Sequence, residues 1–191
     1  ETNEGPGRYI PCKTGATKQG REAGLGFSCF ALKLMYSLKV WDGLNVDDKK
    51  SWIGYINSYQ QDVVIGVPSK STGKSYVDQT LVEYLDRPRI LNLRNILGST
   101  SGWDFLKSIG RPNSYRPIER LLVAETKQAL ATLDQIGEQS VKPFDGFPMS
   151  SAGVKNYMAS FDWRSPWRSG GQTASLAVFL STEAPRLMAT S

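Results

Sequence analysis

The side chains with the greatest capacity for chemistry lie in one short stretch, residues 161–172. Its sequence, FDWRSPWRSGGQ, combines two indoles, two guanidinium groups and one carboxylate. Indoles offer flat apolar faces for stacking, and guanidinium groups offer forked donors for carboxylates or phosphates. The stretch therefore predicts binding of a glycan or another anionic ligand, with Asp162 as a candidate acid or base. The candidate ligand-binding residues are Trp163, Arg164, Trp167, Arg168 and Gln172.

A purely structural interpretation of the same stretch remains open. The two tryptophans would then plug one end of a helical domain, and Asp162 would pair with an arginine or cap the next turn. The Gly-Gly pair at 170–171 would allow two helices to approach closely.

A second candidate is Glu125, which falls between Leu122 and Ala129 on the apolar stripe of a predicted helix, 117–137. A carboxylate in an apolar setting is unfavourable unless it is paired. Glu125 is therefore a general acid with a raised pKa, or it lies at the edge of the stripe, or it forms a buried ion pair with an arginine such as Arg94 or Arg116.

A third candidate is Tyr115 beside Arg116. In lyases that act on uronic acid polymers, a tyrosine can remove a proton while an arginine neutralises the sugar carboxylate. The chain has no histidine, so Tyr115 or Tyr157 would have to be the base. The alternative is that these tyrosines belong to the core or its boundary.

The absence of histidine also limits the possible chemistry. It excludes a Ser-His-Asp triad and a histidine-based zinc site, and we expect neither a metal nor a cofactor. Around Gly66–Ser75 the chain imitates a phosphate-binding loop, but the glycine spacing is wrong and a polar loop is expected. Cys12 and Cys29 are expected to be free thiols, with a single disulfide as the alternative.

Composition indicates a globular protein without a membrane span. Of 191 residues, 40% are apolar and 21% charged, and no apolar run approaches the ~20 residues that a spanning helix needs. The net charge of +5 is dispersed rather than gathered in a basic stripe, so nucleic acid is not an expected partner. No secretory leader is recognised, and the compartment is left open.

Hydrophobic periodicity predicts an all-α fold. An irregular arm, 1–23, precedes a single helical domain, 24–191. The expected helices are 24–41, 49–60, 76–85, 90–97, 103–109, 117–137, 150–161 and 172–182. Helices 24–41 and 172–182 are apolar almost all round, whereas 49–60 and 150–161 are one-sided. This alternation favours two concentric layers, a two-layer α/α barrel or part of one, with a simple helical array as the alternative.

Four stretches resemble a bacterial α/α-toroid family: LGFSCFALKLMYSL, SWIGYINSYQ, AETKQALATLDQIG and FDWRSPWRSGGQTASLAVFL. The resemblance implies the helical-hairpin barrel shared by terpenoid cyclases and several polysaccharide lyases. It implies no particular reaction, because the aspartate-rich motif and the zinc ligands of such enzymes are missing. A full toroid has about twice as many helices, so a partial toroid is implied.

Two hypotheses for function follow. In the first, a carbohydrate- or anionic-glycan-binding or processing domain uses a cleft rimmed by tryptophan and arginine, with Asp162, Glu125 or Tyr115 as catalytic groups and Arg116 as a further ligand contact. In the second, the chain is a non-catalytic scaffold or interaction module. A further chain or a second copy would then complete the barrel.

Overall fold

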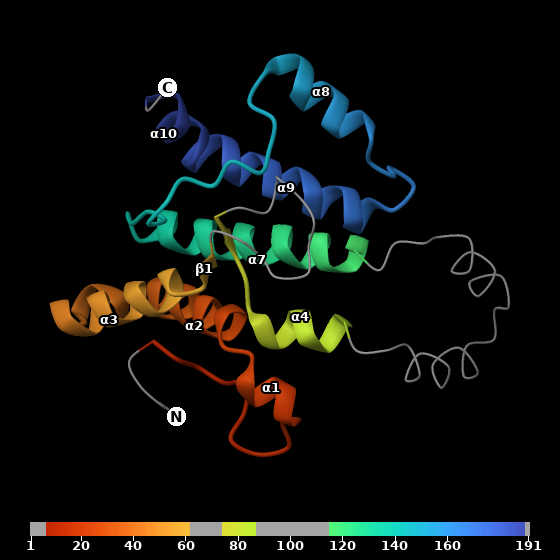
Figure 1. Ribbon diagram of the computed structural model, residues 1–191. Helices are drawn as coiled ribbons and strands as arrows, with labels where there is room; N and C mark the ends of the chain where they lie inside the picture. Colours follow the sequence, from red (N-terminus) through yellow and green to blue (C-terminus); the bar gives the residue numbers. More distant parts are fainter. Residues whose placement is uncertain (1–6, 62–73, 87–114, 190–191) are drawn as a thin grey trace, which may run out of the picture.

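The computed structural model describes residues 7–61, 74–86 and 115–189, and they form the expected all-α fold (Figure 1). The expected helices 90–97 and 103–109, and most of the expected loop 62–75, lie outside these residues. The helices are α1 (Lys18–Glu22), α2 (Leu25–Ser37), α3 (Val46–Asn57), α4 (Gln79–Asp86), α7 (Tyr115–Gln135), α8 (Ser151–Ala159), α9 (Pro166–Thr182) and α10 (Ala184–Ala189). Strands β1 (Gln60–Gln61) and β2 (Ser75–Tyr76) pair antiparallel. Across these same residues, no helix combines the length and the apolar character needed to cross a lipid bilayer.

The long helix α7 runs through the middle of the fold. In Figure 1, α9 lies along one side of it and α2 and α4 lie along the other, with α8 beyond α9. Its apolar stripe is therefore covered from both sides, which accounts for the near-complete burial of Ala129 and Leu133. The buried cluster around α7 also includes Leu25, Cys29, Leu32, Trp52, Ile56, Phe144, Leu176 and Phe179.

One expectation about the layers is wrong. Helix α2 is not buried on more than one side: Leu25, Cys29 and Leu32 face the core, but the opposite row is exposed. Phe30, Leu34 and Leu38 each keep 60% or more of their surface in solvent. The central position belongs instead to α7, whose one-sided sequence pattern did not indicate it.

The ends of the helices follow local chemistry. Ser150 caps α8 as predicted, because its hydroxyl accepts the Gly153 N–H at 3.1 Å. Gly137, with φ +77°, ends α7 as predicted. Helix α3 is capped by Asn45, whose side chain accepts the Asp48 N–H at 2.7 Å, and not by Asp47 or Asp48. Helix α2 stops at Ser37 rather than Trp41.

The N-terminal arm is more ordered than expected. It contains α1, capped by Thr17, and its first described residues lie against α3. The Tyr9 ring stacks on the Trp52 indole, with centroids 4.8 Å apart, and the Tyr9 N–H donates to the Ser28 hydroxyl. The arm therefore closes one end of the core.

We expect Gly7→Ala to lower the free energy of unfolding by about 2–3 kcal/mol, because two penalties add. Gly7 has φ +90°, and a Cβ there would lie 2.8 Å from the Trp52 Cα. Gly15→Ala is the matched control: its φ is +82°, but no described atom lies within 4 Å of the added Cβ. Urea unfolding should show a loss of only about 1 kcal/mol for Gly15→Ala. Equal losses for the two variants would contradict the close packing of the arm on α3.

Candidate functional site

The turn between α8 and α9 is shorter than the sequence suggested. Helix α9 begins at Pro166 rather than at Gln172, with proline in the first turn, where its missing N–H is harmless. Trp167 and the Gly-Gly pair therefore lie inside α9. No described atom comes within 4 Å of a Cβ built on Gly170 or Gly171, so the described residues show no close helix approach at this pair.

Hydrogen bonds to the backbone hold this turn in one shape. The Asp162 carbonyl accepts the Ser165 N–H at 2.9 Å and the Ser169 hydroxyl at 2.7 Å. The Trp163 indole N–H donates to the Met158 carbonyl at 3.1 Å, which ties the turn back to the last turn of α8. The positions of the Trp163 ring and the start of α9 are consequently fixed relative to each other.

Asp162 pairs with Arg164. Its Oδ1 accepts both the Arg164 N–H and the guanidinium Nε–H, each at 3.3 Å. The Arg164 side chain is 95% exposed, so this pair adds little to stability. Its effect is to orient the guanidinium group beside the turn.

The two tryptophans of the turn do not plug the fold. Trp167 is 94% exposed and Trp163 is 55% exposed, although the Trp163 ring keeps contact with Phe161, with ring centroids 5.7 Å apart. We call the surface formed by Asp162, Trp163, Arg164 and Trp167 the α8–α9 corner. It is a protruding aromatic and basic surface rather than the rim of a described cleft.

The remaining candidates of this group are placed only in part. Gln172 lies in α9 and is half-buried. Tyr115 and Arg116 form the start of α7, which lies near the start of α9 in Figure 1. The side chains of Tyr115, Arg116 and Arg168 are outside the described part of the structure.

Glu125 lies on the opposite side of α7 from the corner, against α2 and α4. It is 8% exposed, and its Oε2 accepts the Asp78 N–H at 3.0 Å. Asp78 is itself buried and caps two helices at once. Its Oδ2 accepts the Gly24 and Leu25 N–H groups at 2.8 and 3.2 Å, and its Oδ1 accepts the Thr80 N–H at 3.1 Å.

Burial raises the pKa of Glu125 to about 7, the Asp78 N–H opposes that rise, and the nearby Asp78 carboxylate adds to it. Arg94, one ion-pair partner considered, lies outside the described residues, as does the Arg116 side chain. Within the described ranges, Glu125 accepts the Asp78 backbone N–H and takes part in no ion pair. Asp162 and Glu125 are thus not brought together.

Two tyrosine hydroxyls approach the same junction. Tyr55 and Tyr59 share a hydrogen bond of 2.7 Å, and both hydroxyls lie against Gly24. Burial and the Tyr55 hydroxyl raise the pKa of Tyr59. Tyr157, the alternative base, packs its ring against Phe147 and Phe161, and burial raises its pKa. A tyrosine acts as a base only when its hydroxyl is deprotonated, and a raised pKa makes that form rarer near neutral pH. Tyr59 and Tyr157 are therefore poorly suited to proton removal.

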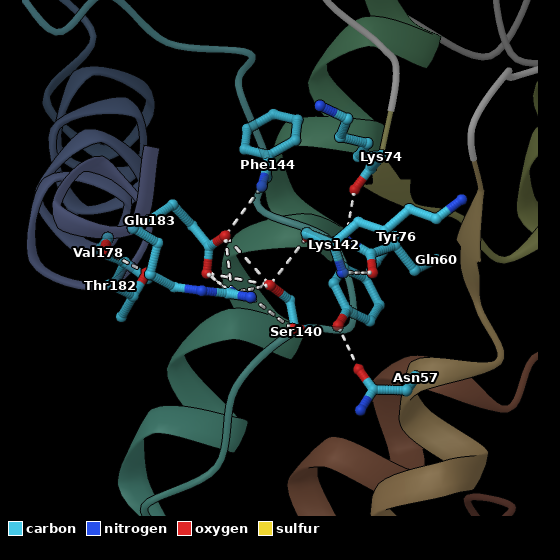
Figure 2. A network of polar contacts seen from close by, with 11 residues as sticks. Asn57, Gln60, Lys74, Tyr76, Ser140, Lys142, Phe144, Val178, Thr182 and Glu183 are labelled. Carbon is cyan, nitrogen blue, oxygen red and sulfur yellow. Dashed lines mark hydrogen bonds and ion pairs between the residues drawn. The ribbon is translucent and has the colours of Figure 1, made fainter. Parts of the chain in front are cut away.

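A third buried carboxylate, Glu183, lies at the α9–α10 junction and was not among the candidates from the sequence. Glu183 is only 1% exposed. Its carboxylate accepts hydrogen bonds from the Phe144 N–H, at 2.8 Å, and from the Ser140 hydroxyl, and it forms an ion pair with the Arg186 guanidinium (Figure 2). Gln60 extends these contacts through its side-chain amide. The amide oxygen accepts the Lys142 N–H, and the amide nitrogen donates to the Lys142 carbonyl. The network ties β1, the 140–144 loop and the last two helices together.

A small polar cavity of about 80 Å³ adjoins this network. Its lining includes Asp134, Glu138, Ser140 and Glu183. The carboxylate of Glu183 is already fully engaged. No group of histidine, cysteine, aspartate or glutamate side chains in the described ranges could hold a metal ion. Cys12 is exposed and Cys29 is buried, with no disulfide between them, and burial raises the pKa of the Cys29 thiol to about 12.

Comparison of the chain with family models, with curated protein sequences and with solved structures found no match. Function is therefore argued from the geometry of the described residues.

Proposed function

We propose that this protein is a helical binding domain that binds an anionic glycan at the α8–α9 corner. The observation that carries the proposal is the exposure of Trp167, which keeps 94% of its surface in solvent. An exposed indole loses hydration when a ligand covers its apolar face, so covering it favours binding. Such a side chain is typical of an aromatic platform for a sugar ring.

The neighbours of Trp167 supply polarity and a fixed geometry. Trp163 is tethered to the Met158 carbonyl, so a second indole is presented in a set position. Arg164 offers the donors that Asp162 does not use, and guanidinium groups bind carboxylates and sulfates with paired bonds. The positive end of the α9 dipole lies at the same corner.

The proposal is for binding and includes no catalytic step. Asp162 is engaged by Arg164, and Glu125 is buried against Asp78, the residue before α4. Glycoside chemistry usually places two carboxyl groups about 5–10 Å apart on either side of an accessible bond. The neighbouring carboxyls of Asp78 and Glu125 are both buried, so they do not flank an accessible bond.

We expect Trp167→Ala to abolish binding to uronic acid oligosaccharides while leaving stability within about 0.5 kcal/mol, because an exposed side chain contributes little to the core. The measurement is a glycan array followed by calorimetric titration with oligogalacturonate, cellohexaose serving as the neutral sugar. Arg164→Gln should weaken oligogalacturonate binding about tenfold and cellohexaose binding less.

Val46→Ala is the matched control, since Val46 is also exposed but lies at the start of α3. It should bind as the wild type does. Loss of the fold in Trp167→Ala, seen by circular dichroism, would instead support the structural interpretation of the corner.

A second candidate function is an interaction module, which the exposed apolar row on α2 favours. In the related proposal for the architecture, these helices are part of an α/α toroid. The exposed apolar row on α2 is then where helices from another chain or a second copy would pack. The exposure of Phe30, Leu34 and Leu38 supports this candidate.

A further inference from the structure

An apolar row runs along the solvent-facing side of α2. It consists of Phe30, Leu34 and Leu38, spaced four residues apart, and all three side chains are exposed. Residues at this spacing form one ridge of a helix, the shape that packs into the groove of a second helix. We call this row, with its lysine border, the α2 face.

The border of the α2 face toward α7 is basic. The Lys33 ammonium lies 3.4 Å from the Gln128 side-chain oxygen, and its pKa is lowered by burial and by the nearby positive charge of Lys127. Neither lysine forms an ion pair with a carboxylate of the described residues. Two positive charges, without a carboxylate partner among the described residues, therefore lie on the α7 side of an exposed apolar ridge.

We propose that the α2 face binds an acidic amphipathic helix of a partner protein. The leucine-type residues of that helix would pack against Phe30, Leu34 and Leu38, and its carboxylates would pair with Lys33 and Lys127. This inference rests on the second candidate function and is independent of glycan binding at the corner.

The positive charges of Lys33 and Lys127 favour an acidic helix over a second copy of the chain as the partner. In a pair of α2 faces, four lysines would be brought toward one interface, and repulsion between like charges is unfavourable there. An acidic helix brings complementary charges instead. Three side chains make a small patch, so the complex is expected to be weak and transient, with fast exchange.

The test uses a labelled helical peptide with leucine at positions i, i+4 and i+8 and glutamate on both borders. Fluorescence anisotropy with the full chain should show saturable binding that weakens as salt is added. Leu34→Ser should weaken binding at least tenfold with the helical circular dichroism signal unchanged. A peptide with lysine in place of glutamate should bind at least tenfold more weakly than the acidic peptide.

Reversing the charge of the two lysines tests whether the charges select the peptide. Nonspecific apolar binding would not change its preference between acidic and basic peptides. The variant Lys33→Glu/Lys127→Glu should lose the acidic peptide and gain the lysine peptide. Val46→Ser, an exposed apolar change outside the face, should leave binding unchanged. Trp167→Ala should also leave it unchanged, so failure of the glycan proposal and failure of this one are distinguishable.

Three results would overturn the proposal. One is the absence of acidic-peptide binding at millimolar concentration. Another is a concentration-dependent dimer that Leu34→Ser disperses, which would assign the face to a second copy. The third is binding to phosphatidylserine vesicles, lost in Leu34→Ser, without binding to the peptide.

Discussion

Glu183→Ala is expected to lower the free energy of unfolding by about 3–5 kcal/mol, because it breaks a buried charge pair from one side. The variant leaves the Phe144 N–H and the Ser140 hydroxyl without their carboxylate, and it leaves the Arg186 guanidinium close to a cavity. Each of these groups keeps its desolvation penalty without the compensating bond. Chemical denaturation followed by circular dichroism measures the loss.

Glu138→Ala is the matched control, since Glu138 lines the same small cavity but is exposed. It should change stability by less than about 0.5 kcal/mol. Combining Glu183→Ala with Arg186→Leu should cost less than the sum of the single changes, with a coupling energy of about 1–3 kcal/mol. Strict additivity would contradict the network in Figure 2.

Glu125→Gln is expected to remove a marked loss of stability that the wild type undergoes as the pH rises from 5 to 8. Folding raises the pKa of Glu125 from 4.5 to about 7, so the native state binds the extra proton between these values. The stabilising contribution of the protonated form is present below pH 4.5 and is lost as the pH rises through 7. Between pH 5 and pH 8 the wild type should lose about 2–3 kcal/mol relative to Glu125→Gln.

The glutamine keeps a side-chain oxygen that can accept the Asp78 N–H. The variant therefore removes the titratable charge of residue 125 but keeps its hydrogen bond. Free energies of unfolding would be measured across this pH range for both proteins. Glu138→Gln, on the exposed surface, should follow the wild-type curve. Parallel curves for wild type and Glu125→Gln would show that Glu125 does not take up a proton in this range.

Local structure was largely predictable from sequence because it depends on neighbouring residues. The stripe of α7, the Ser150 cap and the Gly137 stop all follow from residues within one or two turns. The Asn45 cap carried a local signal as well, in the Asn45–Asp48 pair, which the adjacent aspartates obscured.

The junctions were not predictable, because they join residues far apart in the chain. Asp78 caps α2 across more than fifty residues, and Glu183 reaches Ser140 and Phe144 across about forty. A usable signal did exist for Asp78, since an aspartate before an apolar helix is a typical cap. For Glu183 the sole hint was a carboxylate within an apolar C-terminal segment.

At the α8–α9 corner, the sequence pattern identified the residue types but placed the start of the following helix too late. The residue types in 161–172 indicated either a packed corner or the rim of a cleft, but not that Trp167 would project into solvent from the first turn of α9. The amino-acid composition shows which side chains could bind a ligand. Whether such a side chain is exposed depends on where the helix that carries it begins. That start was misplaced because the Gly-Gly pair suggested a connector.

The central claim, that the α8–α9 corner is a ligand site, is tested most directly by the fluorescence of Trp167 itself. The comparison is between wild type and Trp167→Phe during titration with oligogalacturonate. We predict a saturable change in wild-type emission that is clearly smaller in the phenylalanine variant, in which only Trp163 of the corner still reports, with binding retained in calorimetry because a ring still stacks. Saturable binding with identical emission changes in both proteins would place the ligand elsewhere and contradict the claim, and so would the absence of binding in both.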